Sequence, residues 1–160
     1  MNTPIRQAIS NDIEQIVPLL MALDKLHAQK YPDVFDESKI SSPIRKEFLT
    51  GNIDKSDNLF LVAEIDLKIV GIIHCYTQEI KNHPIKRDKI AAVLSDLYIV
   101  ENFRNKGLAE QLIKKSLEHV KQNWKINDVF LHVFDGNQNA INLYEKSGFK
   151  KQFTRYSINI

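Results

Sequence analysis

The stretch Leu97–Ala109 reads LYIVENFRNKGLA. Its apolar start predicts a strand, which gives way to a short polar turn and then to a predicted helix. Backbone N–H groups at the start of a helix lack partners and carry partial positive charge. Gly107 has no Cβ and lets a ligand approach the backbone, while Arg104 and Lys106 add positive charge. The turn therefore predicts a site for an anion the size of a pyrophosphate.

The same stretch excludes two other phosphate motifs. A P-loop needs a second, spaced glycine and a Lys-Ser/Thr pair, and a dinucleotide fingerprint needs three glycines. This turn has one glycine. The alternative without a ligand is an ordinary strand-to-helix turn in which glycine relieves local strain, and the turn alone leaves both interpretations open.

A second segment, Val133–Phe149, reads VFDGNQNAINLYEKSGF and again joins the end of a predicted strand to a predicted helix. Asn137 is a residue type suited to cap that helix. Ala140 and Tyr144 share one helical face. Gly148 is placed to end the helix in a left-handed conformation.

Together the two segments resemble the GNAT superfamily of acetyl-CoA-dependent N-acyltransferases. Arg104-x-x-Gly107-x-Ala109 matches the family's pyrophosphate motif, (Arg/Gln)-x-x-Gly-x-(Gly/Ala). The segment from Asn137 to Phe149 matches its second cofactor segment, and the two follow each other in the family order. The resemblance extends over nearly the whole chain and is weakest in the N-terminal third.

The resemblance implies where acetyl-CoA binds. Its pantetheine arm would lie along the strand end at Leu97–Ile99, its pyrophosphate on the amides of Arg104–Ala109, and Asn137 beside the pantetheine. Tyr144 would lie near the thioester sulfur. The implied cofactor-binding residues are Leu97, Tyr98, Ile99, Arg104, Asn105, Lys106, Gly107, Leu108, Ala109, Asn137 and Tyr144.

The implied reaction moves the acetyl group to a primary amine of a small molecule or peptide, by direct attack in a ternary complex. Tyr144 is the expected general acid for the departing thiolate. Asp96, just before the strand end, and Glu79, at the end of the preceding strand, are the candidate bases. His74 or a water chain are the alternatives for that role.

Two other functions fit the same motifs. One is a protein or peptide acetyltransferase, and the other is a non-catalytic sensor that binds acyl-CoA without turnover. In the family architecture the segment His27–Lys39 borders the acceptor site. Its acidic and aromatic residues suit a cationic amine, although a solvated loop explains them as well.

Length and composition restrict the remaining possibilities. A chain of 160 residues fits a single domain, 1–160, and a net charge of +2 gives no reason to expect nucleic acid as a partner. No apolar run approaches the roughly 20 residues that cross a bilayer, so we expect a cytoplasmic protein with no membrane partner. The histidines lack metal-like spacing, so we expect no metal. Homodimers are common in the family, often through the C-terminal strands, and the resemblance allows a homodimer here.

The hydrophobic pattern predicts a mixed α/β fold, and the resemblance implies a GNAT-like, mostly antiparallel twisted sheet of six to seven strands flanked by about four helices. The first strand is expected at Thr3–Ile9, and one or two last strands at Phe149–Ile160. Leu59–Gln78 is expected to be a hairpin. Pro18 is expected to kink or divide the first helix.

Overall fold

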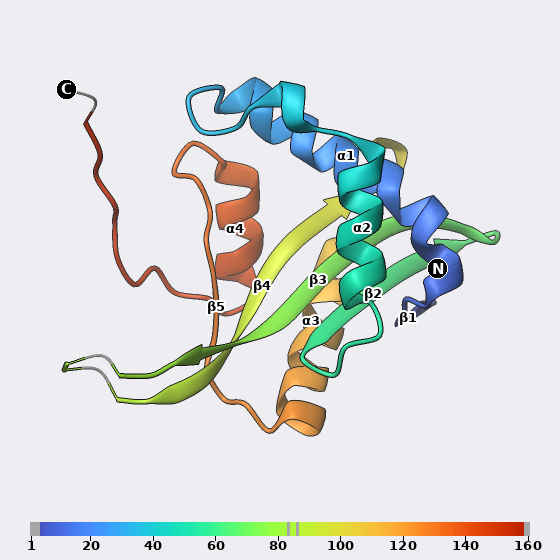
Figure 1. Ribbon diagram of the computed structural model, residues 1–160. Coiled ribbons are helices and arrows are strands. Elements are labelled where there is room, and N and C mark those ends of the chain that lie inside the picture. Colours follow the sequence, from blue (N-terminus) through green and yellow to red (C-terminus); the bar gives the residue numbers. More distant parts are fainter. Residues whose placement is uncertain (1–3, 83, 86, 159–160) are drawn as a thin grey trace.

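A single mixed sheet forms the centre of the computed structural model, which describes residues 4–82, 84–85 and 87–158. Its strand order is β1-β2-β3-β4-β5, antiparallel throughout except for the parallel pair of β4 and β5 (Figure 1). The strands are β1 (Ile5–Gln7), β2 (Asn58–Ile65), β3 (Lys68–Ile80), β4 (Lys89–Ile99) and β5 (Val129–Leu131).

The described residues form four α-helices, which cover the two faces of the sheet. In Figure 1, α1 and α2 lie in front of the strands and α3 lies behind them. The helices are α1 (Ile13–Lys30), α2 (Ser42–Asn52), α3 (Leu108–His119) and α4 (Gln138–Lys146). Short helical turns are η1 (Ser10–Asp12), η2 (Glu37–Lys39), η3 (Glu101–Phe103) and the π-helical η4 (Val120–Trp124).

Alternating side chains of the strands feed two separate cores. On the α1–α2 face, Val62 and Ile72 of the sheet pack with residues such as Leu20. On the other face, Ile73, which follows Ile72 in β3, packs with Leu112 of α3. Side chains of α4 join the same cluster. This alternation is the period of two that a sheet buried on both faces requires.

The predicted hairpin is confirmed. Strands β2 and β3 pair through a turn whose two central residues, Asp66 and Leu67, have φ values of 48° and 63°. Positive φ at both positions is what a two-residue turn of the primed type requires, and this turn achieves it without glycine.

Pro18 does not divide the first helix, because α1 is continuous from Ile13 to Lys30. The proline ring lies on the exposed side of the helix. Glu14, whose carbonyl would have accepted from the missing N–H, is also an exposed residue, so water has access to this side of the helix. The cost of the proline is therefore small enough for the packed face to keep the helix whole.

The prediction of six to seven strands is wrong for the described part of the chain, which has five. Residues 149–158 form no strand, and Thr3, Asn159 and Ile160 lie outside the described residues. In Figure 1 this C-terminal stretch runs away from the sheet, and its apolar side chains beyond Phe149 are solvent-exposed. The exposed fractions are 71 % for Phe153, 92 % for Tyr156 and 84 % for Ile158. A β-prone sequence forms a strand only against a neighbouring edge, and β5 offers three paired residues.

Candidate active site

The end of β4 has a free backbone edge. Strand β5 pairs with β4 only from Ala92 to Leu94. Beyond that point Val100 N–H donates to the Val70 carbonyl of β3 at 2.9 Å. Because backbone groups alternate along a strand, the N–H and C=O groups of Leu97 and Ile99 point to the opposite edge, where β5 has ended.

The turn that follows β4 leads directly into α3. Gly107, immediately before the helix, has a φ of 76°. A Cβ there would make one ordinary contact, with Gln111 Nε2 at 4.0 Å, so glycine is required by the backbone conformation rather than by packing. The first helical bond runs from Gln111 N–H to the Gly107 carbonyl at 3.1 Å. The amides of residues 108–110 consequently have no acceptor within the helix and are directed to its exposed end.

Arg104 holds this turn in place instead of extending from it. Its Nε donates to the Ile99 carbonyl at 2.9 Å, and its guanidinium lies 5.5 Å from the centre of the Tyr98 ring. Its own N–H bonds to the Glu101 carbonyl at 3.1 Å. The anion-binding capacity of the turn therefore belongs to the amides that follow Arg104.

Asn137 immediately precedes α4, but the predicted capping bond is absent: its side chain makes no hydrogen bond to the helix. Its backbone φ of −97° and ψ of 65° differ from the extended geometry of a side-chain cap. The side-chain amide is therefore available for a ligand. Gly148, with a φ of 94°, ends α4 in the predicted left-handed conformation.

Tyr144 lies within α4, half-buried against the core on the α3 face. Its ring contacts Phe149 edge-on at 6.1 Å between centroids. Burial raises the pKa of Tyr144, so the phenol keeps its proton at neutral pH. The hydroxyl is thus a proton donor in an apolar setting.

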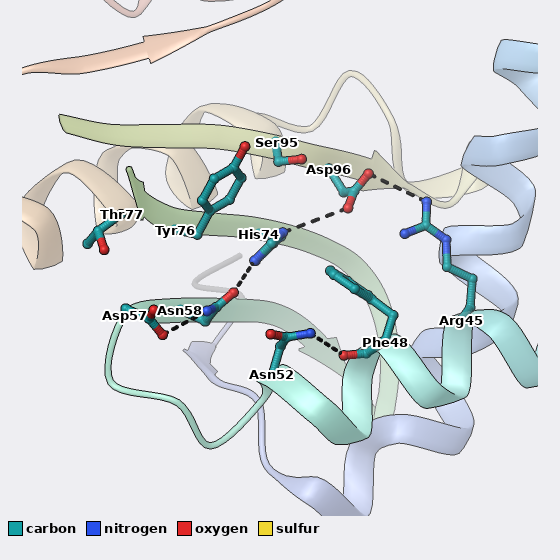
Figure 2. Close-up of a pocket in the computed structure, with 10 residues that line it drawn as sticks. All are labelled: Arg45, Phe48, Asn52, Asp57, Asn58, His74, Tyr76, Thr77, Ser95 and Asp96. Carbon is teal, nitrogen blue, oxygen red and sulfur yellow. Dashed lines mark hydrogen bonds and ion pairs between the residues drawn. The ribbon is translucent and has the colours of Figure 1, made fainter. Parts of the chain in front are cut away.

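A cavity of about 480 Å³ lies where α2 crosses the sheet (Figure 2). A bulge in β4 opens it: the pairing with β3 shifts so that Ser95 and Asp96 together lie opposite His74. The cavity is lined by Arg45, Phe48, Asn52, Asp57, Asn58, His74, Tyr76, Thr77, Ser95 and Asp96.

Asp96 points into this cavity with 16 % of its side chain exposed. Burial raises the pKa of Asp96, and the positive charge of Arg45, whose Nη2 lies 3.7 Å from Oδ1, opposes that rise. Arg45 is itself fixed by Asp24 of α1, which accepts from Nε at 2.7 Å. The carboxyl group is therefore a stronger proton acceptor than an exposed aspartate.

His74 is only 3 % exposed and stacks on Phe60, with 4.2 Å between ring centroids. Burial, and then the charge of Arg45, lowers the pKa of His74 to about 4. The ring is therefore neutral at physiological pH, and its 3.8 Å approach to Asp96 is not an ion pair there. Its Nε2 lies 2.8 Å from Asn58 Oδ1.

The candidate bases are not equally placed. The structure brings Asp96 and His74 together, whereas Glu79 is exposed, pairs with Lys81 at 2.7 Å and does not line the cavity. Sequence reasoning missed Arg45 and Asn58. No motif marks Arg45, and the contact of Asn58 with His74 depends on strand register.

The segment after α1 closes on the loop between β5 and α4. The Tyr31 ring stacks on Phe134 with centroids 4.0 Å apart, and Lys30 donates to the Gly136 carbonyl at 2.7 Å. A second cavity of about 420 Å³ lies beside this segment and shares Arg45 and Phe48 with the first. Four residues of the segment 27–39 line this second cavity: Val34, Phe35, Asp36 and Lys39.

Metal-ligating clusters and membrane-spanning helices are both absent from the described residues. Within residues 4–82, 84–85 and 87–158, no three His, Cys, Asp or Glu side chains gather closely enough to hold a metal ion. None of the helices in these ranges combines the length and the apolarity needed to cross a bilayer.

Comparison with known proteins matches this geometry to a family. The model of the Acetyltransferase (GNAT) family matches residues 20–149. An N-alpha-acetyltransferase of Sulfurisphaera tokodaii is 27 % identical over 154 residues, covering 92 % of this chain and 80 % of that protein. A spermine/spermidine N(1)-acetyltransferase of Bacillus subtilis is 26 % identical over 86 residues, covering 54 % of this chain and 52 % of that protein.

The solved structures agree on the fold. The BH1408 protein from Bacillus halodurans superimposes with a TM-score of 0.82 at 18 % identity, covering 98 % of this chain and 99 % of that one. At that identity the likeness shows the fold alone. With the family match over residues 20–149, the chain belongs to the GNAT acetyltransferase family and is an acetyltransferase.

Proposed function

We propose that this acetyltransferase moves the acetyl group of acetyl-CoA to a primary amine by direct attack in a ternary complex. The observation that carries the proposal is the continuity between the free edge of β4 at Leu97–Ile99 and the unpaired amides that open α3. A ligand with an amide-bearing arm attached to a pyrophosphate complements both parts at once. Acetyl-CoA is such a ligand.

The binding roles follow from which groups are free. The N–H and C=O groups of Leu97 and the N–H group of Ile99 pair with the pantetheine amides, as a neighbouring strand would, whereas the Ile99 carbonyl already accepts from Arg104. The amides of Leu108 and Ala109 receive the pyrophosphate, and residues Asn105–Gly107 shape its seat. The Asn137 side chain, free of its helix, bonds to the pantetheine arm. Arg104 and Tyr98 support the turn and the strand end from behind.

The chemistry requires a proton acceptor, a polarised carbonyl and a proton donor. As the amine nitrogen bonds to the carbonyl carbon, Asp96 takes the proton that the nitrogen loses. A free N–H of the β4 edge stabilises the oxyanion. The C–S bond then breaks, and the hydroxyl of Tyr144 protonates the departing thiolate. Asp96 is preferred to Glu79 because it lies in a cavity beside the strand end, whereas Glu79 is solvated and ion-paired.

A peptide amine is the second candidate acceptor. Two features favour it: the relative named N-alpha-acetyltransferase aligns with 92 % of this chain, and the two cavities that meet at Arg45 and Phe48 extend the space along α2. A small amine needs only the first cavity. Peptides with free N-termini should compete with small amines if both cavities accept substrate.

A screen for CoA release over small amines and peptides tests the proposal, with mass spectrometry of the acetylated product and the Tyr144→Phe variant as control. We expect release that depends on the amine and falls in the variant. Acetyl-CoA binding without turnover on any amine, and without an effect of Tyr144→Phe, would instead show an acyl-CoA sensor.

A further inference from the structure

The hydrogen bonds around His74 determine which of its ring nitrogens carries the proton. Asn58 Nδ2 donates to the carboxylate of Asp57 at 3.0 Å, which fixes the orientation of the Asn58 amide. Asn58 Oδ1 therefore faces His74 Nε2, at 2.8 Å, and can only accept. Because the ring is neutral, the proton is on Nε2 and Nδ1 holds a lone pair.

This lone pair has no hydrogen-bond partner in the described part of the chain, although the atom is buried. It faces Oδ2 of Asp96 across 3.8 Å (Figure 2). Two acceptors at that distance cannot bond to each other. A donor atom between them can reach both, since each bond needs about 2.9 Å. A buried acceptor without a partner costs about 1–3 kcal/mol, so a ligand that supplies the donor recovers that energy.

We propose that His74 Nδ1 and Asp96 Oδ2 together hold the nitrogen of the acceptor and thereby select primary amines. The proposal rests on the proposed function and names a residue, His74, that touches the reacting atom. A neutral primary amine has two N–H groups, one for each acceptor, and a lone pair left for the thioester carbon. A secondary amine has one N–H group and must leave one acceptor unpaired.

The proton balance follows the same two bonds. When the amine lone pair forms the C–N bond, the nitrogen becomes positively charged. The proton already shared with Asp96 moves to that carboxylate, and the C–S bond breaks as Tyr144 gives its proton to sulfur. The amide product keeps one N–H, which still donates to His74 Nδ1.

Asp57 and Asn58 are positioning residues in this scheme, because they act only by fixing the ring of His74. Removing the Asn58 amide frees the ring to place its proton on either nitrogen. An Nδ1–H ring would present a donor to the amine and lose the second acceptor.

The tautomer can be read directly from ¹⁵N chemical shifts of the His74 ring in the free protein. We expect the Nε2–H form in the wild type and a mixture or inversion in Asn58→Leu. Adding n-butylamine should shift the Nδ1 resonance, and N,N,N-trimethylbutylammonium, the quaternary amine that has no N–H at any pH, should not. An Nδ1–H ring in the wild type, or equal shifts with both amines, would overturn the proposal.

Steady-state turnover provides a second test of the proposal. The ratio of kcat/KM for n-butylamine over N-methylbutylamine should be at least about tenfold in the wild type, the effect of one unpaired buried acceptor. His74→Phe keeps the aromatic stack with Phe60 but lacks Nδ1, and the ratio should fall towards one. His119→Phe is the control: it makes the same substitution at a partly buried histidine on α3, outside the cavity, and should keep the wild-type ratio.

The two experiments distinguish a failure of the proposed function from a failure of the role proposed for His74. No CoA release on any amine contradicts the proposed function, and the ¹⁵N titration with n-butylamine then still decides whether the pair binds a primary amine. Turnover with an unchanged ratio in a folded His74→Phe protein contradicts the role of His74 alone.

Discussion

Burial shifts the pKa values of three side chains of the candidate site: it raises those of Asp96 and Tyr144 and lowers that of His74. A higher pKa makes the Asp96 carboxylate a better acceptor for the proton that the amine loses. Because burial raises the pKa of Tyr144, the phenol stays protonated and can donate its proton to the departing thiolate.

Tyr144→Phe removes one hydroxyl from this site. We expect kcat to fall about 100-fold or more, in the range of general acid catalysis. The dissociation constant for acetyl-CoA should stay within about twofold, because the backbone of β4 and α3 provides the binding. Steady-state CoA release and calorimetry measure the two quantities. An unchanged kcat would assign the proton to another donor.

Gly107→Ala tests the conformation of the turn. Alanine at a φ of 76° should lower the free energy of unfolding by about 1 kcal/mol, and since its Cβ would lie no closer than 4.0 Å to a neighbouring atom, backbone strain is the cause. Gly51→Ala is the matched control, because Gly51 lies in α2 and a Cβ there would also meet no close neighbour. It should raise the free energy by about 0.5–1 kcal/mol. Urea unfolding measures both, and equal changes in the two variants would refute the conformational explanation.

At the scale of the elements, turn and cap residues in the sequence predicted the features that depend only on neighbouring residues in the chain. The β2–β3 hairpin and the glycine that ends α4 are set by turn and cap chemistry, and both are present. The C-terminal strands were predicted from β propensity, which does not say whether an edge exists to receive them.

The contact between Asn58 and His74 shows a second limit. Counting back from the Asp66–Leu67 turn pairs Asn58 with Cys75. The observed partner is Tyr76, because a bulge at Ala63/Glu64 shifts the register by one residue. Nothing in the sequence marks that bulge. The turns that open α3 and α4 could be predicted because they depend on helix starts, and the cavity beside His74 could not because it depends on two bulges.

The contact between the end of α1 and the β5–α4 loop is a further element-scale feature. The Tyr31–Phe134 stack should couple these segments by about 1 kcal/mol in a double-mutant cycle of the two alanine variants. Urea unfolding of the four proteins measures that coupling. Strictly additive changes would mean that the stack contributes only separate burial of the two rings.

For the molecule as a whole, the burial of His74 links stability to pH. Its pKa is about 4 when folded and 6.5 without the protein environment, so the unfolded chain binds more protons between these values. Stability from this group is complete above about pH 6.5 and is lost as the pH falls to 4. The loss approaches about 3 kcal/mol.

His74→Phe isolates this contribution from the carboxylates that titrate in the same range. The fall in unfolding free energy from pH 7 to pH 4.5 should be about 2–3 kcal/mol smaller in the variant than in the wild type. Urea unfolding at the two pH values gives the difference. Equal losses of unfolding free energy in the wild type and in His74→Phe would mean that His74 is protonated in the folded protein.

The binding of acetyl-CoA along β4 and at the start of α3 is tested most directly by backbone amide NMR during a titration with acetyl-CoA. The predicted result is a saturable change in the amide signals of Leu97 and Ile99 and of residues 107–110, with little change in β1 and β2. No change at these amides at millimolar acetyl-CoA, or changes confined to other elements, would contradict it.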